Sequence, residues 1–148
     1  MPDLDLDLDF LPRMPARKDF GIGCIGAGFI VRDCHLVAYR NAGFNPVAIA
    51  SRSRARAEET ARLRGVPKVY DTHQQLLDDA GVEIVDIAYP PHEQLGVIRE
   101  TVRRAGHVRG ILAQKPLGVN YEEGREIVRL CEDAGVVLAV NQNMRYDQ

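Results

Sequence analysis

Apolar residues in this chain come in short runs separated by longer segments of mixed polarity. Most runs are apolar almost throughout, which is typical of parallel strands covered on both faces of a sheet. Gly21 and Gly23 lie inside the first run, where a bare backbone lets neighbouring elements approach closely. The runs predict six strands, at 20–25, 46–50, 68–70, 84–88, 110–113 and 136–140, of which 68–70 is the weakest.

The segments between these runs have helical periodicity. The last has apolar or small residues at the spacing of one helix face, namely Gly124, Ile127, Val128 and Cys131. Asn120 followed by Glu123 resembles a capping box at its start, and Gly135 is placed to end the helix. Two further helices are predicted, one over 92–105 and a short one over 72–79.

Strands that alternate with helices in this way predict an α/β fold, a doubly wound parallel sheet of Rossmann type with about six strands. The predicted domain fills residues 20–140. Residues 1–19 contain three prolines and alternate Asp with Leu from 3 to 9. Because Asp is a poor strand former, this segment is interpreted as an extended N-terminal arm.

Composition narrows the class of protein. The 148 residues are 45% hydrophobic and 27% charged, with a formal net charge of −2, which is typical of a soluble globular domain. This balance argues against nucleic-acid and membrane partners, and no apolar run approaches membrane-spanning length. The acidic first ten residues do not resemble a secretory signal. Three cysteines without metal-like spacing favour a reducing, cytoplasmic location, and no metal site is expected.

The stretch GIGCIGAGFIV at 21–31 is the first candidate for chemistry. Gly26 and Gly28 fit the first two positions of G-x-G-x-x-G, in which a tight turn brings a diphosphate to the amides that open a helix. Phe29 and Ile30 follow at that helix start. The third position is Val31, where a small residue is usual, and this departure predicts a wider contact between helix and strand.

The residues after the second strand bear on which nucleotide binds. A site for NAD usually has Asp or Glu here to hold the ribose 2′-hydroxyl, whereas this chain has Ser51-Arg52-Ser53-Arg54. A hydroxyl and a guanidinium suit a 2′-phosphate, which favours NADP over NAD. The alternative is that Arg52 stacks on adenine in either cofactor. The missing carboxylate also argues against a methyltransferase that uses S-adenosylmethionine.

The turn after the fifth strand, AQKPLG, holds Lys115 and Pro116. Ligands of open α/β sheets bind at the carboxyl ends of the strands, which is where this lysine is predicted to lie. Pro116 restricts the backbone on both sides of the peptide bond it shares with Lys115. The turn therefore predicts an ammonium group held towards a ligand.

The motifs GCIGAGFI, AIASRS, DIAYPPHEQ and AQKPLG, in this order, resemble the Gfo/Idh/MocA family, which is named for glucose–fructose oxidoreductase and inositol dehydrogenase. The resemblance covers residues 20–147. Family members typically carry Glu-Lys-Pro after the fifth strand, whereas this chain has Gln114 before Lys115. The lysine and proline carry over, and the acidic neighbour does not.

The resemblance implies an NAD(P)-dependent oxidoreductase acting on a sugar, a cyclitol or a related small molecule. It implies that Lys115 lies near the nicotinamide and hydrogen-bonds the hydroxyl that loses hydride. It also implies that Pro90, Pro91 and His92 border the cofactor, although His92 at a helix start also fits an exposed neighbour of the cap. For His35, near the cofactor-side helix, a packing role is an equal alternative.

Residues 141–148 resemble the family's crossing into a second domain, with Asn141 and Arg145 facing the cleft or forming a plain linker. That domain would supply substrate-binding and proton-transfer groups, so the 148 residues alone are expected to turn over little or nothing. The sequence leaves open whether the protein forms a homo-oligomer through that domain. The alternative function is a non-catalytic nucleotide-binding or protein-interaction module derived from such an enzyme.

Overall fold

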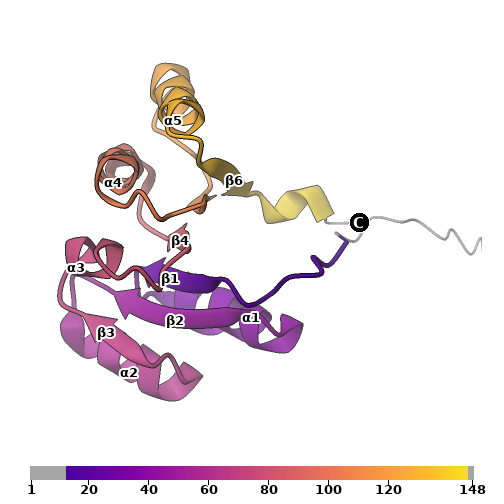
Figure 1. The fold of residues 1–148 in the computed structure, drawn as a ribbon, viewed down its shortest axis with the longest axis vertical. Helices are drawn as coiled ribbons and strands as arrows, with labels where there is room; N and C mark the ends of the chain where they lie inside the picture. Colours follow the sequence, from indigo (N-terminus) through magenta and orange to yellow (C-terminus); the bar gives the residue numbers. More distant parts are fainter. Residues whose placement is uncertain (1–12, 147–148) are drawn as a thin grey trace, which may run out of the picture.

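The computed structural model describes residues 13–146, and these contain a six-stranded sheet in the order β3-β2-β1-β4-β5-β6 (Figure 1). Every neighbouring pair of strands is parallel. This order is the Rossmann arrangement, and it confirms the predicted fold class. The strands are β1 (Gly21–Ile25), β2 (Asn45–Ala50), β3 (Lys68–Tyr70), β4 (Ile84–Ile87), β5 (Gly110–Gln114) and β6 (Val137–Asn141).

The helices are the π-helix η1 (Ile30–His35), α1 (Leu36–Ala42), α2 (Arg54–Arg64), α3 (His73–Leu77), α4 (Pro91–Arg104), α5 (Tyr121–Asp133) and the 3-10 helix η2 (Asn143–Tyr146). Helices α2, α3 and α5 begin at residues whose side chains cap them. The side chains of Ser53, Thr72 and Asn120 accept hydrogen bonds from the first turns of α2, α3 and α5. Gly43 and Gly65 follow α1 and α2 with φ of 75° and 68°, a backbone conformation that favours glycine.

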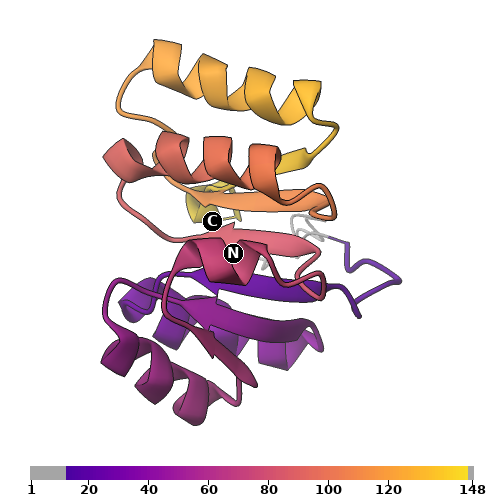
Figure 2. The same ribbon diagram turned by 60° about the vertical axis from the view of Figure 1, so that its left-hand side comes forward.

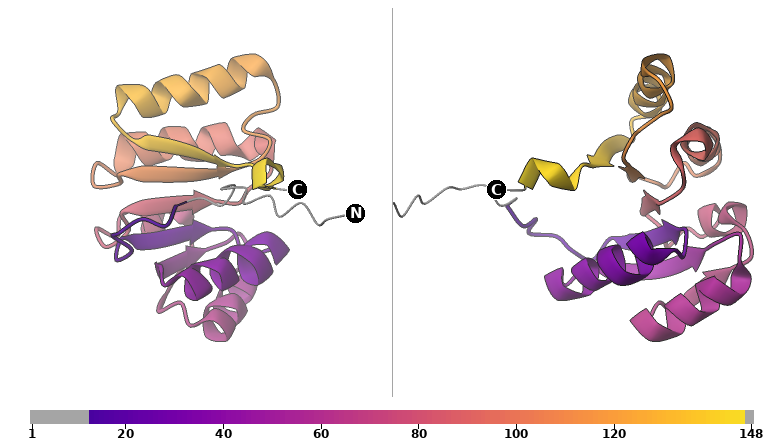
Figure 3. Two further views of the ribbon diagram at one scale, coloured as in Figure 1. Left: turned by 90° about the vertical axis from the view of Figure 1, so that its right-hand side faces the viewer. Right: turned by 180° about the vertical axis from the view of Figure 1, so that it is seen from behind.

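The helices divide between the two faces of the sheet (Figure 2, Figure 3). Helices α3, α4 and α5 cover one face over a core that includes Val85, Ile87 and Ile111. Helices α1 and α2 cover the other face, over a core that includes Cys24 and Ile49. On that second face no α-helix of residues 13–146 lies over β5 and β6, and the 3-10 helix η2 follows the end of β6. The sheet is therefore covered on both faces only at β3, β2, β1 and part of β4.

The two glycines inside β1 allow close packing, as predicted. A Cβ atom on Gly23 would lie 2.7 Å from Val82 Cγ1 and 2.8 Å from Leu76 Cδ2, and one on Gly21 would collide with the backbone oxygen of Gly81. Any side chain at these positions would push β1 away from the loop before β4. The glycines here are structural.

Helix α5 departs from its predicted pattern in two details. Ile127 and Cys131 are buried, but Val128, on the same predicted face, is 40% exposed. The Glu123 carboxylate accepts from the amide of Val119 at 2.7 Å, one residue before the Asn120 cap that the capping box predicts. Gly135 follows the helix with φ of 66°, as expected.

Residues 13–19 of the predicted arm form no helix or strand, and residues 1–12 lie outside the described part of the chain. The Lys18 ammonium donates to the carbonyl of Ala42 at 2.9 Å, and Asn45 donates to the carbonyl of Asp19 at 3.2 Å. These bonds fix the entry into β1. None of the helices between residues 13 and 146 is long and apolar enough to cross a membrane.

Candidate cofactor site

The predicted site residues follow four strands that end at the same edge of the sheet. Gly26 and Gly28 follow β1, Ser51 and Arg52 follow β2, Pro90–His92 follow β4, and Lys115 and Pro116 follow β5. The crossovers run in opposite directions from β1 and β4, which are direct neighbours. The carboxyl ends of these two strands form the switch point where open parallel sheets bind ligands.

The bend after β1 contains two glycines with different constraints. Gly26 has φ of 125°, and a Cβ atom on it would lie 3.1 Å from the carbonyl oxygen of Ala88. Its amide donates to the carbonyl of Ala50 at 2.8 Å, so Gly26 joins the ends of β1 and β2. Gly28 has no positive φ, and nothing lies within 4 Å of a Cβ atom placed on it. The described protein gives no reason for glycine at 28, so this space fits a ligand that approaches the backbone.

The helix that starts at this bend has no side-chain cap. Phe29 occupies the N-cap position and no side chain bonds to the first turn. The amide of Arg32 donates to the carbonyl of Gly28 at 2.9 Å, and the amides of Ile30 and Val31 before it are the donors that an anion could use. Val31 is fully buried and lies in the π-helical segment η1, whose turns are wider than those of an α-helix. The wider turn coincides with the residue that departs from the glycine motif. Phe29 is 66% and Ile30 41% exposed at the mouth of the bend.

The end of β2 carries an arginine with two partners from the other half of the sheet. Arg52 Nη1 lies 3.0 Å from Glu93 Oε1 on α4, and its guanidinium lies 5.5 Å from the ring centroid of Tyr89. Its side chain is still 71% exposed, so the guanidinium can be reached by a ligand. Arg54 pairs instead with Glu58 and Asp71, away from this contact. Only Arg52 of the two predicted cations is placed for the switch point.

The loop after β4 begins helix α4. Pro90 is the N-cap and Pro91 the first helical residue, a position that suits proline because its missing N–H would have no partner in the helix. His92 is exposed, with Nε2 3.7 Å from Glu93 Oε1. The loop therefore borders the switch point with a rigid backbone, and the imidazole of His92 points to solvent beside Glu93.

The turn after β5 exposes Lys115 and Pro116. The amide of Lys115 donates to the side-chain oxygen of Gln114 at 3.0 Å, and the Lys115–Pro116 peptide bond is cis. The side-chain amide of Gln94, fully buried on α4, donates to the carbonyl oxygens of Gln114 at 3.0 Å and Pro116 at 2.8 Å. The turn is thus held from beneath by a residue that the sequence analysis did not single out.

A buried polar network joins β4 to helix α1 and the end of β6. Asp86, 1% exposed, accepts from His35 Nδ1 at 2.7 Å and from the Tyr39 hydroxyl at 2.8 Å. The side-chain nitrogen of Asn141 lies 2.6 Å from His35 Nε2, which fits a neutral imidazole that donates through Nδ1 and accepts through Nε2. Burial, and then the Asp86 carboxylate, raise the pKa of Tyr39, which keeps the phenol a donor. His35 therefore has a packing and hydrogen-bonding role, and Asn141 turns towards it.

These residues differ in how visible they are in the sequence. Asp86 interrupts the apolar run IVDIA, and a lone carboxylate in a buried strand is a signal of a buried polar contact. Gln94 carries no such signal, because glutamine on a helix is usually a surface residue. The side chain of Arg145 lies outside the described residues.

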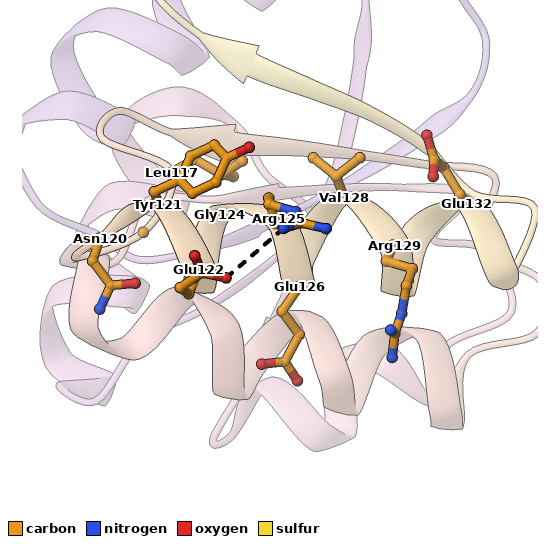
Figure 4. A pocket seen from close by; sticks show the side chains of 11 residues that line it. Leu117, Asn120, Tyr121, Glu122, Gly124, Arg125, Glu126, Val128, Arg129 and Glu132 are labelled. Carbon is orange, nitrogen blue, oxygen red and sulfur yellow. Dashed lines mark ion pairs between the residues drawn. The ribbon is translucent and has the colours of Figure 1, made fainter.

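A separate hollow lies along the outer side of α5, away from the switch point (Figure 4). Tyr121, Val128 and Leu117 contribute apolar surface to it, and Glu122 and Arg125, neighbours on α5, form an ion pair beside it. It contains none of the residues predicted to hold the cofactor.

Comparison with known proteins yields a family match. Residues 20–142 match the profile of GFO_IDH_MocA, described as an oxidoreductase family with an NAD-binding Rossmann fold. The chain is 35% identical over 118 residues to trans-1,2-dihydrobenzene-1,2-diol dehydrogenase of Oryctolagus cuniculus, covering 77% of this chain and 34% of that enzyme. It is 33% identical over 116 residues to D-xylose 1-dehydrogenase (NADP(+)) 2 of Haloferax volcanii, covering 78% of this chain and 35% of that enzyme.

The fold also matches solved structures. A complex of levoglucosan dehydrogenase with NADH and levoglucosan superposes with a TM-score of 0.76 at 28% identity, covering 86% of this chain and 36% of the enzyme. The chain spans about a third of the length of the curated relatives it matches. The family match, over residues 20–142, includes the glycine bend and the Lys115 turn.

Proposed function

Because this chain belongs to the Gfo/Idh/MocA oxidoreductase family over residues 20–142, we propose that its glycine bend binds NADP or NAD in a dehydrogenase or reductase. The whole protein would transfer a hydride between that cofactor and a hydroxyl or carbonyl carbon of a sugar, a cyclitol or a related small molecule. The observation that carries the proposal is the open space at Gly28, where a Cβ atom would meet nothing within 4 Å. A diphosphate approaching the uncapped amides of the next helix would need that space.

In this proposal Gly26, Gly28, Phe29 and Ile30 hold the diphosphate, and Pro90, Pro91 and His92 border the cofactor. A bound nicotinamide supplies the position that takes up or releases the hydride. The Lys115 ammonium donates a hydrogen bond to the substrate oxygen on the reacting carbon. It stabilises the negative charge that develops on that oxygen and orients the carbon. The neighbouring Gln114 is neutral, so Lys115 acts here without the adjacent carboxylate.

For the nucleotide, we propose that NADP is preferred. Ser51 and the exposed Arg52 stand where the 2′-phosphate of NADP would lie, and no carboxylate follows β2 to hold a 2′-hydroxyl. Glu93 opposes this preference, because it already neutralises part of the Arg52 charge. The proposal therefore expects a moderate preference rather than an absolute one.

We further propose that a second domain follows the described residues and completes the active site. General acid–base chemistry needs groups within hydrogen-bond reach of the substrate, and in this proposal Lys115 is the residue of the described edge that contacts the substrate. That domain would also carry the interface of a homo-oligomer.

Cys24 and Cys131 are buried free thiols and Cys34 is an exposed one, which supports a reducing, cytoplasmic location.

Calorimetric titration of the chain with NADP+ and NAD+ tests the cofactor proposal. We expect both to bind, NADP+ more tightly, and Arg52→Asp to remove the preference. Absence of binding to either dinucleotide would refute the proposed function, and a preference for NAD+ would refute only the nucleotide assignment.

The role of Lys115 is tested in the whole protein by Lys115→Met, with Lys18→Met as the matched control. We expect Lys115→Met to lower kcat by about 100-fold or more while the dinucleotide still binds. Lys18 donates to the carbonyl of Ala42, away from the site, so Lys18→Met should leave kcat unchanged. Undiminished turnover by Lys115→Met would contradict the catalytic role and favour the alternative of a non-catalytic nucleotide-binding module.

A further inference from the structure

The turn that carries Lys115 is supported by one buried side chain. Gln94 is 0% exposed and lies in the first turns of α4, beneath the turn after β5. Its Nε2 donates to the carbonyl oxygens of Gln114 and Pro116, the residues on either side of Lys115, at 3.0 and 2.8 Å. The two hydrogens of a primary amide are therefore divided between the two flanks of the lysine.

The other atom of the same amide has no partner. Gln94 Oε1 is buried and accepts no hydrogen bond from the described residues. A buried acceptor left unpaired destabilises the fold, because it has lost its bonds to water without replacement. Rotating the amide would place this oxygen against two carbonyl oxygens, so the two donated bonds fix the orientation that leaves Oε1 unpaired. An apolar side chain of the same length would avoid that cost, but it would also remove the two hydrogen bonds to the carbonyls of Gln114 and Pro116. What the glutamine supplies at this position is therefore the pair of donors to the turn.

We propose that Gln94 is a positioning residue that fixes the backbone on both sides of Lys115 and thereby directs the ammonium towards the nicotinamide. The inference rests on the proposed function of Lys115 and extends it to a residue that touches neither cofactor nor substrate. It places the support for the lysine on α4, the same helix that carries Glu93 opposite Arg52. One helix thus orders both ends of the proposed dinucleotide site.

The test uses the small number of lysines in the chain, Lys18, Lys68 and Lys115. Reductive methylation with 13C-formaldehyde gives each lysine a dimethylamine signal, and the signal missing from Lys115→Arg identifies Lys115. Lys18 holds the Ala42 carbonyl and Lys68 pairs with Asp79, so they serve as internal references. In the wild-type chain, NADP+ or NAD+ should shift the Lys115 signal and leave the other two in place.

Gln94→Met keeps the length of the side chain and removes the two donors. We expect the dinucleotide to bind within a few-fold of wild type, the Lys115 shift to fall to less than half, and the carbonyl 13C signals of Gln114 and Pro116 to move. The matched control is Thr101→Val, which removes a buried hydroxyl on α4 that donates only within its own helix, to Val97. The control should retain the Lys115 shift and both carbonyl signals.

A pH-dependent rescue separates positioning from a general loss of structure. In Gln94→Glu, the carboxylate has no hydrogen to donate, and burial raises the pKa of such a group. Protonation returns one O–H donor, so the Lys115 shift should recover as the pH is lowered, whereas Gln94→Met should show no recovery.

The outcomes are distinguishable. A folded Gln94→Met chain with wild-type carbonyl signals and a full Lys115 shift would overturn the inference. A wild-type chain that bound neither dinucleotide would refute the proposed function, and with it the direction of Lys115 towards a nicotinamide. In that case the carbonyl signals of the unliganded variants would still decide whether Gln94 holds the turn.

Discussion

Strands β1 and β6 have five residues each and are both largely apolar, yet every residue of β1 is buried and none of β6 is. Strand β1 lies at the centre of the sheet, paired with β2 and β4 and covered by helices on both faces. Strand β6 pairs with β5 alone, and Val137 on it is 71% exposed. Similar composition thus contributes differently to stability, because position in the sheet decides how much apolar surface is removed from water.

The same division separates two kinds of proposed site residue. The centre of the sheet provides the glycine bend, which is proposed to hold the diphosphate. The β5 side provides Lys115, whose turn depends on the amide of Gln94 from α4. Binding should therefore depend on the densely packed centre, and turnover on the less covered side.

The largest expected effect is on stability at the centre of the sheet. Ile49→Ala removes a fully buried side chain from β2 and should lower the free energy of unfolding by about 2–5 kcal/mol. Val137→Ala on β6 should change it by no more than about 0.5 kcal/mol. Urea unfolding followed by circular dichroism measures both. Equal costs for the two substitutions would break the comparison between the central and outer strands.

The next effect is on binding at the glycine bend. Gly28→Val fills the space left open beside the backbone and should weaken dinucleotide binding by about tenfold or more, since tenfold corresponds to only about 1.4 kcal/mol. Gly124→Ala on α5 is the control, because a Cβ there also meets nothing within 4 Å. The control should leave binding unchanged and increase stability by up to about 1 kcal/mol. Calorimetry that found both variants equal in binding would refute the role of the bend.

The loss of folding stability at acid pH should also come from the half of the sheet that is covered on both faces. Lys68, the amide of Gly81 and the Tyr70 hydroxyl hold the pKa of Asp79 below its ordinary value of 3.8. A lowered folded-state pKa contributes stability that is present above about pH 4 and is lost as the pH falls through the folded-state value. Asp79→Asn should remove about 1 kcal/mol at pH 7 and flatten the loss below about pH 4.

The control for that titration is Asp133→Asn on α5, where the side chain is 74% exposed and 4.0 Å from Arg129. Its unfolding curves at neutral and acidic pH should follow those of the wild type. If Asp133→Asn flattened the acid loss as much as Asp79→Asn, the assignment to Asp79 would be wrong.

The smallest effect concerns the ion pair that joins the two halves. Glu93→Gln frees Arg52 from a carboxylate, so NADP+ should gain affinity relative to NAD+ by a few-fold, the size expected of an exposed pair worth less than about 1 kcal/mol. The ratio of the two dissociation constants measures it. Glu58→Gln, which affects Arg54 only, is the control. A ratio that moved in favour of NAD+ would contradict the placement of Arg52 beside the 2′-phosphate.

The sequence predicts the strands well because each is a compact apolar run between turn residues, as in FGIGCI and IVDIA. It predicts the helix starts at Thr72 and Asn120 because a cap is a local interaction between residues three apart. It also identifies the Rossmann class, because the alternation of elements leaves few topologies.

The contacts between distant residues could not be predicted in the same way. The bond from Gln94 to Pro116 joins positions 22 apart, and that from His35 to Asp86 joins positions 51 apart. Nothing local distinguishes Gln94 from a solvated helix residue. On the predicted apolar face of α5, Ile127 is buried and Val128 is 40% exposed, because periodicity gives the direction of a side chain but not the extent of the surface it faces.

The contact between Asn141 and His35 has a mechanical consequence. It joins the last strand to the first crossover helix across 106 positions of the chain. That helix starts at the bend containing Gly28, at the same edge of the sheet, so a displacement of the backbone just after β6 would be transmitted to the bend through one imidazole ring. A rotation of the proposed second domain would then shift the backbone that is proposed to bind the diphosphate.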